Sequence, residues 1–119
     1  MSHEIKFEIQ LDENKIPEKI QWTATGSSSD QPKDAKALLI SLWDLKENVT
    51  LAIDLWTKEM LVSDMGLLYY QTLIHLAESY ERATFDKTAG DKIREAAEKF
   101  ADHLQLSSGK TPPPQDDEK

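Results

Sequence analysis

The chain has no cysteine, and this absence excludes several kinds of function. Without a thiol it cannot form a disulfide, bind zinc through thiolates or use a cysteine nucleophile. Glycine is also scarce, with four in 119 residues, and the sequence contains no Gly-x-Gly-x-x-Gly, Walker-type or Gly-x-Ser-x-Gly motif. We therefore expect neither a nucleotide-binding loop of these types nor a bound cofactor.

Basic residues are in the minority. The sequence has 14 Lys and Arg residues and 22 Asp and Glu residues, which gives a formal net charge of -8. A chain of this charge repels phosphate backbones and anionic lipid surfaces, so we expect no nucleic-acid partner and no direct membrane insertion. The acidic excess also keeps a small protein soluble, and this reading is favoured over a dedicated acidic patch.

Long hydrophobic runs are missing as well. The first residues, Met-Ser-His-Glu-Ile-Lys-Phe-Glu, alternate in character and do not form the apolar stretch of a signal peptide, and no segment approaches transmembrane length. We expect a cytoplasmic protein. The hydrophobic fraction of 39% and the length are ordinary for one globular domain, which we place at residues 1–106.

The first third of the chain has the alternation of half-buried strands. Ile5, Phe7, Ile9 and Leu11 alternate with polar residues, and after the turn-forming segment 12–15 a second alternating run contains Ile20, Trp22 and Ala24. These two runs predict a β-hairpin. The small polar residues from Gly26 to Pro32 predict an exposed loop after it.

The segment from Ala35 to Leu45 is ambiguous between a helix and a strand buried on both faces. The next segment, Thr50 to Trp56, alternates again, and Asp44 to Asn48 is a polar connection of hairpin length. We therefore favour a second hairpin, with a possible helical turn before it that begins at Pro32.

Two helices are predicted in the second half. Apolar residues recur at helical spacing from Met65 to Ala83, with Ser63 as N-cap, and again from Ile93 to Leu104, after a capping-box-like segment that starts at Thr88. Residues 107–119 contain three prolines and no apolar residue, and they predict a disordered, Pro-rich acidic tail. The fold class is α+β: an antiparallel sheet of about four strands in two hairpins, then two C-terminal helices packed on one face.

Residues capable of catalysis are present without a catalytic pattern. The histidines, His3, His75 and His103, have no metal-ligand spacing, although His75 beside the apolar helix face could be buried or pH-sensitive. Asp44 and Asp54 could approach across the second hairpin, but in so acidic a chain a chance pair is the better explanation. We predict no catalytic residue, no metal site and no enzyme activity.

The aromatic residues are more suggestive of binding. Trp22, Trp43 and Trp56 lie on three predicted strands, and Trp56 is out of phase with the apolar residues before it. An exposed tryptophan would be a good interface anchor, whereas the plainer interpretation is that Trp56 closes the edge of the core. The same two readings apply to Tyr69 and Tyr70, because adjacent helix residues point in different directions.

Several long phrases resemble one family. The stretches are Leu11 to Trp22 (LDENKIPEKIQW), Ile53 to Met60 (IDLWTKEM), Tyr70 to Leu73 (YQTL) and Glu81 to Thr84 (ERAT). They are similar to the GldC family of gliding-motility-associated proteins of Bacteroidota, in order from about Ile5 to Leu106. The resemblance implies an accessory component of gliding motility, a process tied to the type IX secretion system, and it carries no catalytic residues.

Our hypothesis is a noncatalytic protein that binds other proteins, with gliding-apparatus components as partners. Loops between elements often carry function, so we place the interaction surface at the junction between sheet and long helix. Its residues are Trp56, Thr57, Lys58, Glu59 and Met60, with Trp22 and Tyr70 as neighbours. The alternatives are a small-molecule-binding domain or minor enzyme with a pocket between sheet and helices near His75, and a structural homo-oligomer.

Overall fold

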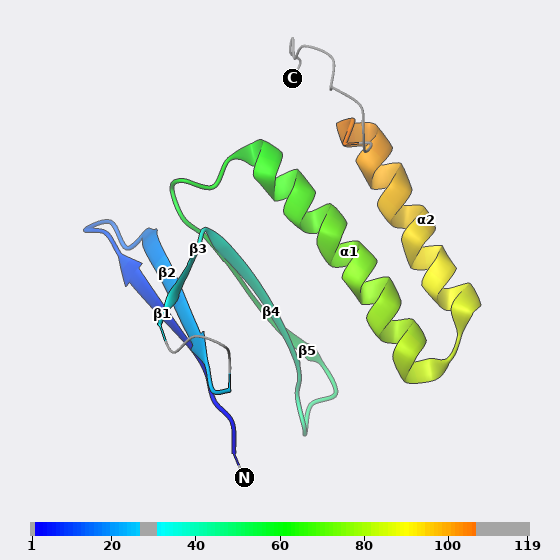
Figure 1. Ribbon diagram of the computed structural model, residues 1–119, viewed down its shortest axis with the longest axis horizontal. Helices are drawn as coiled ribbons and strands as arrows, with labels where there is room; N and C mark the ends of the chain where they lie inside the picture. Colours follow the sequence, from blue (N-terminus) through cyan, green and yellow to red (C-terminus); the bar gives the residue numbers. More distant parts are fainter. Residues whose placement is uncertain (1, 27–30, 107–119) are drawn as a thin grey trace. The chain divides into compact units, whose positions relative to one another are not determined.

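The computed structural model describes residues 2–26 and 31–106, and the predicted tail lies outside these ranges. The chain divides into two compact units, Met1–Leu61 and Val62–Lys119. The first contains five strands in two antiparallel sheets, and the second contains two helices (Figure 1). The predicted α+β class, with hairpins first and two helices last, is confirmed. The expectation that 1–106 behaves as one domain stays a prediction.

The first sheet has the order β1-β2-β3, with β1 at Ile5–Leu11, β2 at Pro17–Ala24 and β3 at Lys33–Ala35. The predicted first hairpin is confirmed: β1 and β2 pair from Ile5 opposite Ala24 to Leu11 opposite Pro17, with a bulge next to the turn. The short β3 pairs with the middle of β2 and replaces the helical turn that we considered at Pro32. That prediction is wrong because the β2 edge offers this segment ladder hydrogen bonds.

The second sheet is the predicted second hairpin, β4 (Ala37–Trp43) and β5 (Thr50–Trp56). Only Lys36 separates β3 from β4, so the chain pairs with β2, bends at Lys36 and then pairs with β5. Strands that change sheets at a bend form the corners of β structures. Lys36 is such a corner, and it resolves the ambiguity of Ala35 to Leu45 in favour of a strand.

Burial in the sheet unit is concentrated near this corner. Ile20 of β2 is fully buried and Leu38 of β4 is 9% exposed, whereas large apolar residues farther along the second hairpin, such as Leu42 and Trp43, are more than half exposed. Asp54 is the only charged residue among the 14 residues of β4 and β5. The second hairpin is thus an apolar ribbon with two unpaired edges among the described residues.

The helical unit consists of α1 (Val62–Thr84) and α2 (Lys87–Leu104), which lie side by side and antiparallel (Figure 1). The N-cap of α2 is Asp86, whose Oδ1 accepts a hydrogen bond from the Ala89 backbone N–H at 3.0 Å. The predicted start at Thr88 is therefore wrong by two residues, because an aspartate two residues earlier caps the helix instead. The helix ends at Gln105, which adopts a left-handed conformation.

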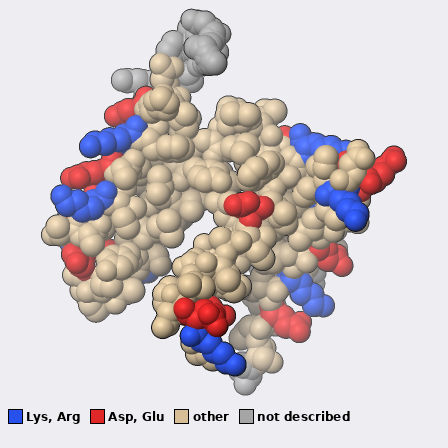
Figure 2. Space-filling model, turned by 180° about the vertical axis from the view of Figure 1, so that it is seen from behind, with Lys and Arg blue, Asp and Glu red and all other residues tan. Residues whose placement is uncertain are grey.

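Small residues bring the two helices together. Ala77 of α1 and Gly90, Ala97 and Ala101 of α2 are buried. A Cβ added to Gly90 would lie 3.4 Å from the Ala77 carbonyl oxygen, so the backbones approach closely at this point. Around this seam, Lys and Arg side chains are interspersed with Asp and Glu on the outer surface of α2 (Figure 2). Within the described ranges, no helix is both long and apolar enough to cross a bilayer.

Candidate functional site

The predicted junction is built on the corner at Lys36. The Lys36 carbonyl accepts two hydrogen bonds from Thr57, one from the backbone N–H at 2.8 Å and one from Oγ1 at 3.0 Å. Thr57 is 5% exposed, because it lies directly after the last ladder pair, Ala37 with Trp56. Its hydroxyl is therefore engaged in holding the corner, and the side chain presents almost no surface to a partner.

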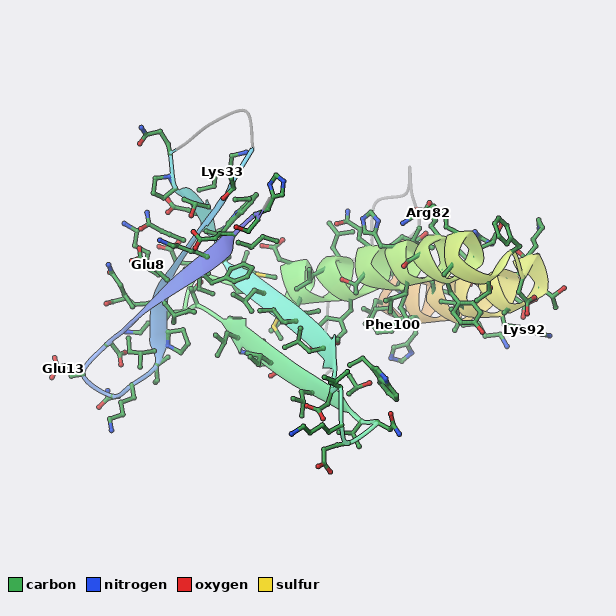
Figure 3. All side chains as sticks on the ribbon, turned by 90° about the horizontal axis from the view of Figure 1, so that it is seen from below. Glu8, Glu13, Lys33, Arg82, Lys92 and Phe100 are labelled. Atoms are coloured by element: carbon green, nitrogen blue, oxygen red, sulfur yellow. The ribbon has the colours of Figure 1, made fainter. Side chains whose placement is uncertain are left out.

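Lys58 is engaged in a structural contact as well. Its Nζ lies 2.6 Å from Asp12 Oδ2, and Asp12 Oδ1 accepts backbone hydrogen bonds from Asn14 and Ile16 at 2.7 and 3.0 Å. The bond from Lys58, followed by these backbone donors, lowers the pKa of Asp12, and the same pairing raises the pKa of Lys58. This ion pair ties the first hairpin turn, where Glu13 projects outward, to the segment after β5 (Figure 3).

A hollow of about 530 Å³ opens beside the corner. Its charged lining consists of two lysines and three carboxylates: Lys19, Lys36, Glu18, Asp34 and Glu59. The side chains of Ile20 and Thr57 also line it. Glu59 is exposed and reaches this hollow, while Met60 is half-buried and its N–H closes a turn onto the Thr57 carbonyl at 3.1 Å.

Trp56 is 40% exposed, and it does not line this hollow. Of the five junction residues, Trp56, Lys58 and Glu59 are exposed. Lys58 has its Nζ in the ion pair with Asp12, although half of its side chain remains exposed. An exposed fraction of 40% fits both readings of Trp56, the interface anchor and the edge of the core.

Trp22 lies in the same unit but in another place. Its ring is 5.4 Å from Lys33 Nζ, which is its cross-strand partner on β3, and it lines a separate hollow of about 190 Å³. A cation over an indole face is attracted by the ring quadrupole. The structure thus pairs Trp22 with Lys33.

Tyr70 belongs to the helical unit. Its hydroxyl donates a hydrogen bond of 2.8 Å to Glu98 Oε2, and this bond, with burial as a second cause, raises the pKa of Tyr70. Tyr70 therefore links α1 to α2. His75 is not buried, because 79% of its side chain is exposed, with Glu78 Oε1 at 3.8 Å.

The possible approach of Asp44 to Asp54 is not found. Asp54 lies opposite Leu39, five residues before Asp44, so the two carboxylates are separated by roughly 17 Å of strand. Asp44 instead accepts backbone hydrogen bonds from Lys46 and Glu47 in the hairpin turn.

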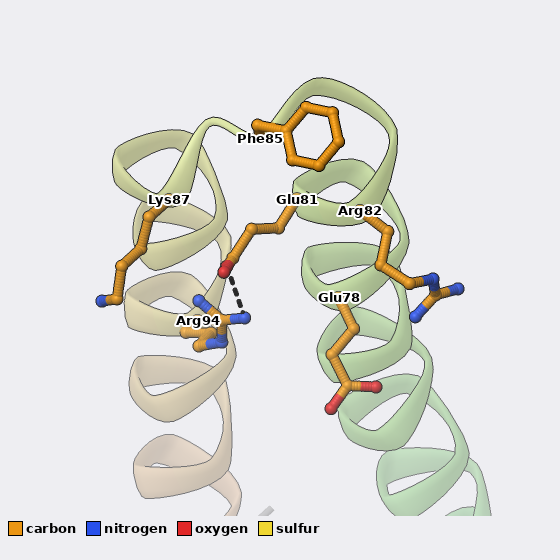
Figure 4. A pocket seen from close by; sticks show the side chains of 6 residues that line it. All are labelled: Glu78, Glu81, Arg82, Phe85, Lys87 and Arg94. Carbon is orange, nitrogen blue, oxygen red and sulfur yellow. Dashed lines mark hydrogen bonds and ion pairs between the residues drawn. The ribbon is translucent and has the colours of Figure 1, made fainter.

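A second hollow, of about 520 Å³, lies at the tip of the helical hairpin and was not predicted (Figure 4). It is lined by Glu78, Glu81, Arg82, Phe85, Lys87 and Arg94. Arg94 reaches from α2 to Glu81 on α1, with Nη2 to Oε1 at 2.7 Å, and also bonds Asp91. These bonds raise the pKa of Arg94. No sequence motif marks this set, because its members come from two helices and the loop between them.

Two comparisons gave no match: no curated protein and no solved structure corresponds to the chain. Within residues 2–26 and 31–106, no cluster of three or more metal-binding side chains is present. The profile of the family described as gliding motility-associated protein GldC-like matches residues 17–106. This range contains the second strand of the first hairpin, the corner, the junction and both helices, and it omits β1 and the first half of the phrase Leu11 to Trp22. Because the match covers most of the 119 residues, the chain belongs to the GldC-like family, which is associated with gliding motility.

Proposed function

We propose that the protein is a noncatalytic, cytoplasmic accessory component of gliding motility in Bacteroidota, linked to type IX secretion, and that it acts by binding other proteins of the gliding apparatus. Membership of the GldC-like family is the observation that carries this proposal. The junction supports the noncatalytic part of this proposal, because its buried hydroxyl and its ammonium group are both engaged in structural contacts.

The binding surface that we propose is centred on Trp56 and Glu59. A large, rigid aromatic side chain that is already 40% exposed can bury much apolar area in an interface at little entropic cost. The corner at Lys36 and the Asp12–Lys58 pair hold this segment in place before binding, which lowers the cost of ordering it.

The test is crosslinking capture of the tagged protein from a gliding host, followed by mass spectrometry against a tag-only control. Recovery of gliding or secretion components is the expected result, and Trp56→Ala should reduce it at least tenfold, as the loss of an interface anchor does. Leu45→Ala is the matched control. Leu45 is 91% exposed and lies in the turn between β4 and β5, at the opposite end of that hairpin from Trp56. If a folded Trp56→Ala protein captured its partners as well as the wild type, this surface would not be the binding surface.

The hollow beside the corner favours a second candidate, a domain that binds a small molecule. Its volume is within the range of ligand pockets, and its mixed charges suit a zwitterionic or polar compound. A ligand that binds only the folded state raises the melting temperature by mass action. A metabolite screen without a shift would count against this candidate.

The apolar second hairpin favours a third candidate, a structural homo-oligomer. An open strand edge with few charges is a template for pairing with a second copy. Light scattering after gel filtration decides this point, because a monomer at every accessible concentration rejects it.

A further inference from the structure

The loop between the two helices contains a residue that its backbone does not favour. Phe85 has a φ of +60°, in the left-handed region, where a bulky side chain is a real outlier. Its N–H donates a hydrogen bond of 2.7 Å to the Glu81 carbonyl, which is the bond of a helix C-terminus closed by a left-handed residue. Glycine or asparagine usually occupies this position.

The neighbouring residues fix this conformation from both sides. The Asp86 N–H donates to Thr84 Oγ1 at 3.2 Å, and the Asp86 carboxylate caps α2 through the Ala89 N–H. The two-residue connection from α1 to α2 therefore requires the left-handed residue that glycine would supply without strain. A phenylalanine at this position weakens the turn.

Packing does not account for the phenyl ring either. Phe85 is 91% exposed, the same fraction as the turn residue Leu45. Exposing an aromatic ring in a strained backbone lowers both stability and solubility, so another property of the ring must be useful. Residues kept in sparsely populated conformations are found preferentially at functional sites.

Arg82 places a positive charge near the Phe85 ring. It lies one helical turn before Phe85, lines the same hollow and has no ion-pair partner among the described residues. Its side chain points away from α2, whereas Arg94 points toward Glu81 (Figure 4). The other nearby cations are neutralised: Lys87 pairs with Asp91 at 2.8 Å and Arg94 with Glu81 at 2.7 Å.

We propose that Phe85 and Arg82 form a protein-binding anchor, in which the ring enters an apolar pocket of a partner protein and the guanidinium meets a carboxylate at the rim of that pocket. Aromatic residues and arginine are the types that dominate interface energetics. A protein is favoured over an anionic membrane because Glu78 and Glu81 also line this hollow in a chain of charge -8. The proposal does not depend on Trp56 or on the gliding role.

The first experiment is thermal unfolding of Phe85→Asn. Asparagine tolerates the left-handed conformation, so we expect the melting temperature to rise by about 4 °C. A fall in the melting temperature would mean that the ring stabilises the fold, and it would overturn the proposal.

The second experiment places a photo-crosslinking phenylalanine analogue at position 85 of the full chain in a gliding host. The control carries the analogue at Lys92, which is exposed on α2 (Figure 3). We expect an adduct with one protein at position 85 and not at position 92, with at least a tenfold loss when Arg82→Glu is added. Replacing the carboxylate in the mapped partner peptide by lysine should then restore the adduct of the Arg82→Glu protein.

Three outcomes would contradict the anchor. They are an adduct at position 85 no stronger than that at position 92, an adduct that Arg82→Glu leaves unchanged, and crosslinking only to a second copy of the chain. The membrane alternative is tested with vesicles of phosphatidylserine and phosphatidylcholine. Sedimentation of the wild type with these vesicles, lost in Phe85→Asn, would assign the ring to a lipid surface instead.

Discussion

At the scale of single residues, Thr57 was predicted as part of the binding surface, but its side chain stabilises the fold. Thr57 looks from its sequence like a polar surface residue after a strand, yet it is 5% exposed and donates both its N–H and its hydroxyl to one carbonyl. A buried polar group of this kind is retained because its hydrogen bonds are satisfied.

Thr57→Val should therefore lower the free energy of unfolding by about 1 kcal/mol, because valine keeps the shape and the N–H bond but loses the hydroxyl bond. Urea denaturation measures the change. Thr50→Val, at the exposed start of β5, is the matched control and should leave the midpoint nearly unchanged. Equal midpoints for the two variants would mean that the hydroxyl does not stabilise the corner.

The Asp12–Lys58 pair predicts a dependence of stability on pH. The pKa of Asp12 is lowered below its ordinary value of 3.8, so its contribution is complete above that value and is lost as the pH falls through the folded-state pKa. Asp12→Asn should be less stable than the wild type at pH 7 and should lose less stability between pH 5 and pH 2. The control is Glu13→Gln, which removes one negative charge at the neighbouring position. Its stability should fall between pH 5 and pH 2 by as much as that of the wild type.

At the scale of elements, the helical hairpin depends on small residues. Ala97 is fully buried in the seam between α1 and α2, whereas its neighbour Ala96 is exposed. Ala97→Leu should destabilise the protein by about 1–3 kcal/mol, since the added methylenes push apart two closely packed backbones. Ala96→Leu should change stability by less than about 0.5 kcal/mol. Helical circular dichroism during urea unfolding compares the two, and similar losses would show that the seam tolerates larger side chains.

At the scale of the whole molecule, charge is the property with the clearest consequence. Each unit carries 11 acidic and 7 basic residues, so the net charge of both halves opposes the electrostatic attraction on which nucleic-acid binding depends. We predict no change in the anisotropy of a labelled DNA duplex on titration with the protein, even at low salt, where such attraction is strongest. Salt-sensitive binding would mean that local clusters, such as Arg82 with Lys87, outweigh the net charge.

The sequence by itself determined both hairpins and both helices, but not β3. Period-two alternation gave both hairpins, helical spacing gave both helices, and the family phrases predicted the family that the profile match confirms. These features are local, since each depends on residues that are near one another in the chain. The absence of cysteine likewise excluded thiol chemistry without reference to any fold, and the net charge predicted that nucleic acid is not a partner.

Only the tertiary structure decided which side chains are engaged in contacts within the protein and which are available for binding. The sequence could not show that the chain changes sheets at Lys36, that Asp12 meets Lys58 across 46 residues, or that Arg94 reaches Glu81 from another helix. It also could not show Phe85 in a left-handed turn, because that conformation is imposed by the caps of two helices together. Contacts between distant residues depend on the path of the backbone, and that path follows from packing the whole chain and not from any one segment.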